Sequence, residues 1–282
     1  MADFANTQAG TKPEALNGVL DAIVANKHIE VKARQAQISL ETLKAQAQPL
    51  TGFPFEAALR QEKNVHLITE IKPSSPSAGI LQSELDLDGV LVAYNRYASA
   101  ISVLTDEKYF GGSFERLATV SQQSPHSTLC KDFILEEYPV YEARLAGAAA
   151  VLLIVKILDD ATLHQLHTCI RELGMTPVVE VQNETELARA LAIGADVLLI
   201  NNRDLSSFDI ALETTHRLVK VLQERLTPEA AAQKIIISAS GIASRSDIET
   251  LLPSAHCFLV GSSLMKQPIE ALPHLLADLA GC

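Results

Sequence analysis

The sequence predicts an α/β fold, a single (β/α)8 barrel with an N-terminal helical extension. Short aliphatic or β-branched runs alternate with amphipathic stretches from residue 66 onward, and there are eight of these runs. Eight apolar strands separated by helices are the pattern of this barrel. Amphipathic stretches such as "DDATLHQLHTCIRELG" and "NETELARALAIG" end on a glycine, as many helices do. An open doubly wound sheet is the main alternative, but no glycine-rich fingerprint follows the first strand.

The predicted strands lie between residues 66 and 260. They are His66–Ile71, Ala100–Leu104, Thr128–Cys130, Ala150–Val155, Pro177–Val181, Val197–Ile200, Ile235–Ile237 and Cys257–Val260. Before them, apolar residues recur at spacings of three and four from Glu14, and helical character continues to about residue 47. Residues 1–13 are polar and end at a proline, so we expect them to be disordered. The chain therefore divides into an extension over residues 1–47 and one barrel domain over residues 48–282.

The charge balance limits the possible ligands. With 23 basic and 34 acidic residues, the net charge is −11. This argues against general nucleic-acid binding, which needs clustered lysine and arginine to neutralise phosphates. A small anionic substrate remains compatible, because a local pocket can be positive on an acidic protein.

The cysteines and the apolar runs indicate the cellular compartment of the protein. Four cysteines form no CxxC pair, so neither a disulfide framework nor a zinc site is expected, and a reducing cytoplasm is the default location. The N-terminus lacks the apolar core of a signal peptide. No apolar run approaches the ~18 residues of a membrane span, so no membrane contact is expected.

Charged and polar side chains follow several of the predicted strands at their carboxyl ends, where these barrels carry their chemistry. Glu70 and Lys72 are two residues apart and therefore point to the same side of the first strand. Later strand ends supply Lys131, Lys156, Glu180, Asn201, Asn202 and Arg203. Any one of these could be an ordinary solvated loop residue, and the two asparagines could be turn formers. Their convergence on one mouth carries the argument, because buried charges persist when they pair or are used.

The last two predicted strands both end in small residues. Ser240 and Gly241 follow the seventh strand, and Gly261, Ser262 and Ser263 follow the eighth. The recurrent phosphate site of these barrels uses these two loops, where small residues let backbone N–H groups approach an oxyanion. Each motif alone could be an ordinary turn. Their pairing on strands seven and eight predicts a phosphorylated substrate.

Six motifs in chain order resemble those of the indole-3-glycerol-phosphate synthases of tryptophan biosynthesis. They are "EIKPSSPSAG", "SAISVLTDEKYFGGS", "LCKDFI", "VVEVQNETEL", "INNRDL" and "FLVGSSLM", and the resemblance covers roughly residues 14–275. It implies closure of 1-(2-carboxyphenylamino)-1-deoxyribulose 5-phosphate to indole-3-glycerol phosphate, with loss of CO2 and water. It also implies that no metal or organic cofactor takes part. We expect no fused isomerase domain, and a self-contained barrel is compatible with a monomer.

The resemblance implies a role for each matching residue. Lys131 matches the general acid, and Glu180 matches the carboxylate that transfers a proton during dehydration. Glu70 and Lys72 match the pair on the first strand, with the lysine suited to the carboxylate of the substrate. The other matches are Asn201 and Arg203 around the sugar and anthranilate, Phe110 and Phe133 as walls for the anthranilate ring, and Ser75, Ser240, Gly241, Gly261 and Ser262 as a phosphate cradle.

One position departs from the resembled family. The family usually has a glutamate before the Ser-Gly that follows the seventh strand, and this chain has Ala239. Alternation along the strand places Ala239 on the side of Ile235 and Ile237, which we expect to face the barrel interior. A slowed enzyme, an engineered substitution and a non-catalytic paralogue that binds a phosphorylated ligand are all compatible with this change. A Schiff-base aldolase using Lys131 or Lys156 is a further alternative, since desolvated lysines form imines.

Overall fold

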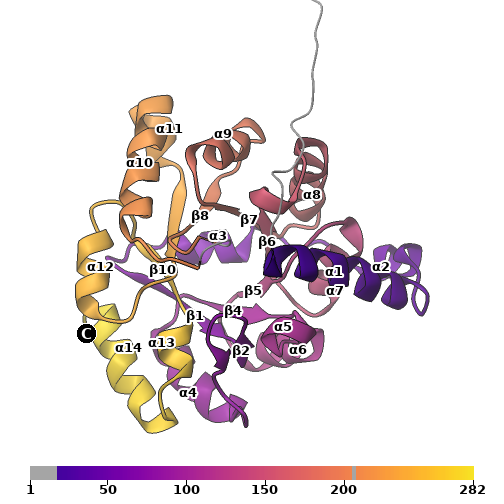
Figure 1. Ribbon diagram of the computed structural model, residues 1–282, viewed down its shortest axis with the longest axis horizontal. Coiled ribbons are helices and arrows are strands. Elements are labelled where there is room, and N and C mark those ends of the chain that lie inside the picture. Colours follow the sequence, from indigo (N-terminus) through magenta and orange to yellow (C-terminus); the bar gives the residue numbers. More distant parts are fainter. Residues whose placement is uncertain (1–17, 205–207) are drawn as a thin grey trace, which may run out of the picture.

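The computed structural model describes residues 18–204 and 208–282. Within these ranges, eight parallel strands close into a ring with helices around it, the (β/α)8 or TIM barrel that the sequence predicts (Figure 1). The barrel strands are β1 His66–Ile71, β4 Ala100–Leu104, β5 Thr128–Lys131, β6 Ala150–Ile154, β7 Thr176–Val181, β8 Val197–Asn201, β9 Ile235–Ala239 and β10 Cys257–Val260. The ring closes where β1 pairs with both β4 and β10.

The helices cover the outside of the barrel (Figure 1). They are α1 Val19–Gln35, α2 Leu40–Gln46, α3 Pro54–Leu59, α4 Leu87–Tyr97, α5 Glu107–Phe110, α6 Phe114–Gln123, α7 Glu137–Leu145, α8 Asp160–Glu172, α9 Glu184–Ala192, α10 Glu213–Arg225, α11 Pro228–Ala232, α12 Arg245–Leu251, α13 Ser262–Met265 and α14 Leu272–Ala280. Side chains of Asp159, Asn183 and Ser244 cap the first turns of α8, α9 and α12. These caps fix where each loop turns back into a helix, because they satisfy N–H groups that the helix itself leaves unpaired.

The barrel strands are buried on both faces. Every residue of β1, β4, β6, β7 and β10 is buried. One face of such a strand lines the barrel interior and the other packs under the helices, so its sequence is apolar throughout instead of alternating. Glu70 in β1 and Glu180 in β7 are therefore carboxylates within fully buried strands that are mostly apolar.

Most strand boundaries agree with the prediction; β7 begins one residue earlier, at Thr176, and the other differences lie at the carboxyl ends. Three strands run one or two residues further, to Lys131, Asn201 and Ala239, because each of these residues still pairs with a neighbouring strand. The strand predicted to reach residue 155 ends at Ile154, where a 3-10 turn, η1 Val155–Ile157, begins. Polar or small residues thus belong to the strands themselves, which fixes their direction relative to the barrel.

The N-terminal extension contains two helices instead of one continuous helical segment. α1 ends at Gln35, and the Ser39 hydroxyl begins α2 by accepting a hydrogen bond from the N–H of Thr42 at 3.2 Å. Both helices contact α7, and α1 begins over the end of the barrel and leads outward to α2 (Figure 1). The expected disorder of residues 1–13 and the predicted helix start at Glu14 lie outside the described residues.

Candidate active site

A cleft of about 500 Å³ lies at the carboxyl ends of the barrel strands. This volume is within the range of small-molecule sites. All the residues to which the resemblance assigns a role line this cleft: Glu70, Lys72, Ser75, Phe110, Lys131, Phe133, Glu180, Asn201, Arg203, Ser240, Gly241, Gly261 and Ser262. Ala239 lines it as well, so the expectation that this position faces the interior is confirmed.

Two lysines and a carboxylate form an ion cluster at one wall of the cleft. Glu70 Oε1 lies 2.8 Å from Lys72 Nζ, and Glu70 Oε2 lies 3.6 Å from Lys131 Nζ. Burial of Glu70 would raise its pKa, but the two lysines outweigh burial and hold that pKa below its usual range. Glu70 is therefore an anion that compensates both ammonium groups and fixes where they point.

Gly261 allows this cluster to form. A Cβ added at Gly261 would lie 2.2 Å from Glu70 Oε1, far inside any real contact distance. The residue after β10 must therefore be glycine while the Glu70 carboxylate occupies its present position. This close approach is possible because β1 and β10 are adjacent strands of the ring.

Glu180 belongs to a second polar network. Asn201 Nδ2 donates a hydrogen bond of 3.0 Å to Glu180 Oε1. The Asn201 oxygen in turn accepts from the Ser240 hydroxyl at 2.8 Å and from the N–H of Arg203 at 3.0 Å. Burial raises the pKa of Glu180, although Lys131 and the hydrogen bond from Asn201 act in the opposite direction. The cleft thus holds two buried carboxylates whose pKa values are shifted apart, an arrangement suited to acid–base chemistry.

An apolar wall faces the same cleft. The rings of Phe110 and Phe133 lie with centroids 5.8 Å apart and their planes tilted by 38°. Leu20 and Ile23 of α1 add aliphatic surface to the lining. A flat aromatic group is the natural partner for such a surface.

Small residues shape the loops after β9 and β10. Ser240 and Gly241 have φ angles of 69° and 83°, in the left-handed region. A Cβ at Gly241 would lie 2.5 Å from Ile210 Cγ2, so a larger residue there would displace the Ile210 side chain and strain the backbone. The Ser263 hydroxyl joins the two loops by donating to the carbonyl of Ile242 at 2.9 Å. Two neighbouring loops therefore present backbone and hydroxyl groups to one end of the cleft.

The loop after β1 contains a hairpin that the sequence did not predict. It consists of β2 Ser74–Ser75 and β3 Gly79–Ile80, which pair antiparallel. The Ser75 hydroxyl accepts a hydrogen bond from the N–H of Ala78 at 3.2 Å. Gln82 Nε2 donates to the carbonyl of Met265 at 2.8 Å, which ties this loop to α13. The hairpin is too short to produce a periodic sequence signal.

Two candidates from the strand ends do not line the cleft. Lys156 lies in η1, after β6. Asn202 is buried, and it donates to the Ser238 hydroxyl at 3.0 Å and accepts from the Thr215 hydroxyl at 2.8 Å. These contacts join β8 to β9 and α10, so Asn202 supports the barrel wall.

Sequence reasoning missed other residues of the lining. Leu20 and Ile23 were recognised as the apolar face of a helix, but periodicity does not reveal which surface such a face covers. Lys266 and Gln267 also line the cleft, just after α13. They directly follow the sequence "GSSLM", and this proximity to the predicted phosphate loop could have indicated them as lining residues.

The described residues hold no group of three or more His, Cys, Asp or Glu placed to bind a metal ion. Over the same ranges, no helix is both long enough and apolar enough to cross a membrane.

Comparison with known sequences gives a consistent result. A family model described as "Indole-3-glycerol phosphate synthase" matches residues 20–272. The chain is 42% identical over 247 residues to "Tryptophan biosynthesis protein TrpCF" of Salmonella typhi, covering 88% of this chain and 52% of that protein. It is 39% identical over 268 residues to "Indole-3-glycerol phosphate synthase" of Crocosphaera subtropica, covering 93% and 90%. The chain thus spans about half the length of the TrpCF protein and most of the length of the Crocosphaera one.

Solved structures with similar backbones have much lower sequence identity. One is 3-hexulose-6-phosphate synthase from Salmonella typhimurium, with a TM-score of 0.56, 15% identity, and coverage of 77% of this chain and 97% of that one. Another is a chain of the tryptophan synthase complex from Pyrococcus furiosus, with a TM-score of 0.56, 14% identity, and coverage of 78% and 99%. At this level of identity the likeness concerns the fold alone, and it agrees with the closed barrel.

Proposed function

The chain belongs to the indole-3-glycerol phosphate synthase family, and we propose that it closes the indole ring of 1-(2-carboxyphenylamino)-1-deoxyribulose 5-phosphate. The products would be indole-3-glycerol phosphate, CO2 and water, which makes the protein a carboxy-lyase of tryptophan biosynthesis. The observation that carries the proposal is the meeting of Glu70, Lys72, Lys131 and Glu180 in one cleft.

The phosphate end of the substrate is proposed to bind at the loops after β9 and β10, together with Ser75 of the β2 hairpin. Ser240, Gly241, Gly261 and Ser262 supply small residues there, so that backbone N–H groups can approach an oxyanion. The left-handed backbone at Ser240 and Gly241 supports this placement, since such turns commonly form anion-binding concavities.

The aromatic end is proposed to lie against Phe110 and Phe133. Their rings provide an apolar wall of the size that an anthranilate ring needs. Lys72, held by Glu70 at 2.8 Å, is suited to pair with the carboxylate that the ring carries. Asn201 and Arg203 would then contact the sugar between the two ends of the substrate.

Ring closure needs a strong electrophile, because the attacking carbon belongs to a neutral arene. We assign this task to Lys131, whose ammonium group would protonate the ketone oxygen as the new carbon–carbon bond forms. The anionic Glu70 lies 3.6 Å from this ammonium group and compensates its charge. The ring carbon that formed the bond then loses CO2, and the electron pair of the broken bond restores the aromatic ring.

Dehydration completes the reaction. It removes a hydroxyl from one carbon and a proton from the neighbouring methylene, so it needs an acid and a base a few ångströms apart. Glu180 is proposed to take this proton. Its raised pKa makes it a stronger base than an exposed carboxylate, and Asn201 holds its position. The departing hydroxyl would receive its proton from the Lys131 ammonium group, which solvent has reprotonated after ring closure, and would leave as water.

A turnover assay tests the proposal. The purified protein mixed with the carboxyphenylamino-deoxyribulose phosphate is expected to produce indole fluorescence. The chain contains no tryptophan, so the product emission is not masked by the protein. If the substrate raises the melting temperature but no emission develops, the protein binds without turnover and the proposed reaction is wrong.

Ala239→Glu is expected to raise kcat/KM by about tenfold, since a carboxylate there restores a charge that the family usually has. The position lies between Asn201 of β8 and Leu259 of β10 and faces a cleft with more basic than acidic side chains. Steady-state kinetics of Ala239→Glu and Ala239→Gln separate charge from size. If the glutamate variant is no faster than the glutamine variant, the cleft is complete without this carboxylate.

The protein is further proposed to act in the cytoplasm as a monomer, without a cofactor and without nucleic-acid or membrane partners. The net charge of −11 supports the lack of nucleic-acid binding. The division into an extension over residues 1–47 and a barrel over 48–282 is proposed on the same footing. Relatives of about this length exist, as do relatives about twice as long.

A further inference from the structure

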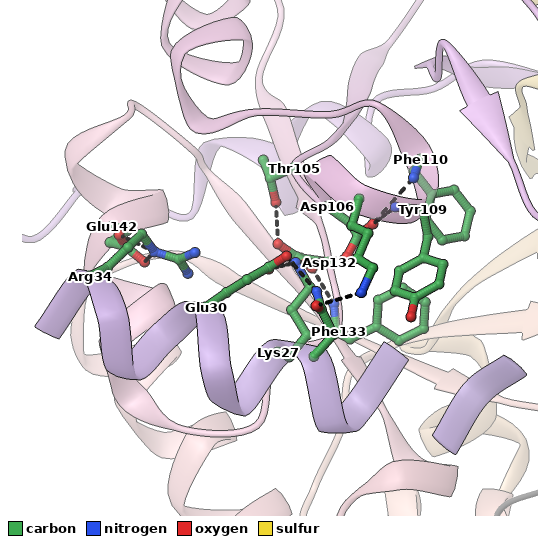
Figure 2. Close-up of polar contacts among 12 residues, drawn as sticks. Lys27, Glu30, Arg34, Thr105, Asp106, Tyr109, Phe110, Asp132, Phe133 and Glu142 are labelled. Carbon is green, nitrogen blue, oxygen red and sulfur yellow. Dashed lines mark hydrogen bonds and ion pairs between the residues drawn. The ribbon is translucent and has the colours of Figure 1, made fainter. Parts of the chain in front are cut away.

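A buried lysine joins the N-terminal helix to the two loops that form the apolar wall of the cleft. Lys27 of α1 is 3% exposed, and its Nζ lies 2.8 Å from Asp106 Oδ2 and 2.9 Å from Asp132 Oδ1 (Figure 2). Glu30 adds a third carboxylate oxygen at 3.0 Å. Burial opposes a charge at this position, but Asp132 and Asp106 outweigh it and raise the pKa of Lys27. The lysine is therefore a buried cation between two buried carboxylates.

Each aspartate also holds the backbone of a cleft residue. Asp106 caps α5 and accepts a hydrogen bond of 3.2 Å from the N–H of Phe110. Asp132 accepts a hydrogen bond of 2.7 Å from the N–H of Phe133 and one of 2.7 Å from the Thr105 hydroxyl. Figure 2 shows both aspartates turned toward Lys27 from the loops after β4 and β5. The position of each ring is thus linked, through one carboxylate, to the same ammonium group.

We propose that Lys27 is a positioning residue: its charge holds the loops after β4 and β5 together and so sets the separation of the Phe110 and Phe133 rings. The kinetic part of this inference rests on the proposed function, whereas its structural part does not. The helix that carries Lys27 also contributes Leu20 and Ile23 to the cleft. α1 therefore lines the cleft itself and, through Lys27, also holds the two loops that carry the aromatic rings.

The charge, not merely the bulk, of Lys27 is needed. Asp106 is 0% exposed and Asp132 is 3% exposed, so without a cation two buried carboxylates would face each other uncompensated. Breaking a buried ion pair in this way is strongly unfavourable, and the two loops relieve it by moving apart or by taking up a proton. Lys131 is less affected, because it lies within β5 and pairs there with Leu104 of β4. Loss of Lys27 is therefore expected to displace the rings of Phe110 and Phe133 and to leave the position of Lys131 unchanged.

Lys27→Met tests this, since methionine keeps the unbranched side chain and removes the charge. We expect KM for the carboxyphenylamino-deoxyribulose phosphate to rise about tenfold with kcat changed by less than about twofold, because the wall binds ground state and transition state alike. Hydrogen–deuterium exchange is expected to become faster in residues 105–112 and 132–135 without substrate. The double variant Lys27→Met/Asp106→Asn is expected to recover part of both changes, because asparagine keeps the cap and removes one of the opposed charges.

Lys32→Met is the matched control, because it makes the same chemical change on the same helix. The side chain of Lys32 is exposed, whereas that of Lys27 is buried. The control variant is expected to keep the KM and the loop exchange of the unchanged protein. If Lys27→Met does not fold, Lys27→Gln, which keeps a donor but no charge, is judged by the same criteria.

Three results would overturn the inference: an unchanged KM and loop exchange in Lys27→Met, an equal change in Lys32→Met, or no recovery in the double variant. A lack of turnover in the unchanged protein would instead remove the proposed function. In that case hydrogen–deuterium exchange and the double variant decide the role of Lys27 by themselves.

Discussion

Lys131→Met is expected to lower kcat by about a thousandfold, the upper part of the range for loss of a general acid in a desolvated site. Methionine matches the length of lysine, and the side chain lies at the end of β5, where it is 22% exposed, so the fold should persist. In the proposed mode of binding, the loops after β9 and β10 and the aromatic wall hold the substrate, so KM should change far less than kcat. Product fluorescence under saturating substrate measures the loss, and circular dichroism confirms the fold.

Lys156→Met is the matched control for this variant. Lys156 also follows a barrel strand, but it lies in η1 and does not line the cleft. Its kcat is expected to stay within about twofold of the unchanged protein. Similar losses in both variants would mean that charge near the barrel mouth matters in general, and that Lys131 has no special role as the acid.

Glu180→Gln is expected to lower kcat by about a hundredfold and, at the same time, to raise the melting temperature at neutral pH. Glutamine keeps the acceptor for the Asn201 hydrogen bond but cannot take a proton from the substrate. Burial raises the pKa of Glu180 in the folded protein. The stability that such a shift contributes is present below the unfolded pKa and is lost as pH rises through the folded pKa. The gain in melting temperature should therefore fade as pH falls below about 4.3, the usual pKa of an unfolded-state glutamate, because the carboxyl then becomes protonated in both states.

Glu70→Gln is the control, and its melting temperature at neutral pH is expected to change in the opposite direction. The lysines beside Glu70 hold its pKa below the usual range, so its charge contributes stability above the unfolded pKa, and that stability is lost as pH falls through the folded pKa. Glu70→Gln should lower the melting temperature at neutral pH, while Glu180→Gln raises it. Thermal denaturation of both variants at neutral and acidic pH measures the two effects. A shift of the same sign in both would contradict the assignment of opposite pKa shifts.

The strands of the barrel were predictable because fully buried parallel strands leave a simple pattern. Each is an apolar run of four to six residues, and eight such runs with helices between them fit few other folds. The exact carboxyl ends were less predictable. Asn201 and Ala239 continue their strands because they pair with each other across β8 and β9, and a single run of sequence does not reveal such a partner.

The site residues were predictable for a different reason. In this fold the carboxyl ends of all strands meet at one mouth. A polar residue at the end of an apolar run is therefore expected to lie at that mouth. Glu180 and Lys131 follow this rule. Lys156 does not, because the chain turns into η1 immediately after β6. That local turn left no signal in an aliphatic run that continues through the lysine.

Lys27 could not have been identified from the sequence. A lysine in an amphipathic helix usually belongs to the solvated face, and only the packing of α1 over the barrel buries it. Its partners, Asp106 and Asp132, follow two different strands far along the chain, and each has an ordinary local role as a cap or turn residue. The three charges become a unit only when the fold brings them together.

The contact between Gly261 and Glu70 makes these two positions a coupled pair for directed evolution. A library that randomises residue 261 alone should return glycine almost exclusively, because any side chain collides with the carboxylate. Variation becomes accessible only after residue 70 is shortened, and the ion partners of both lysines change at that moment. Altering the specificity of this cleft at the junction of β1 and β10 therefore requires simultaneous exchange at sites encoded near opposite ends of the barrel sequence.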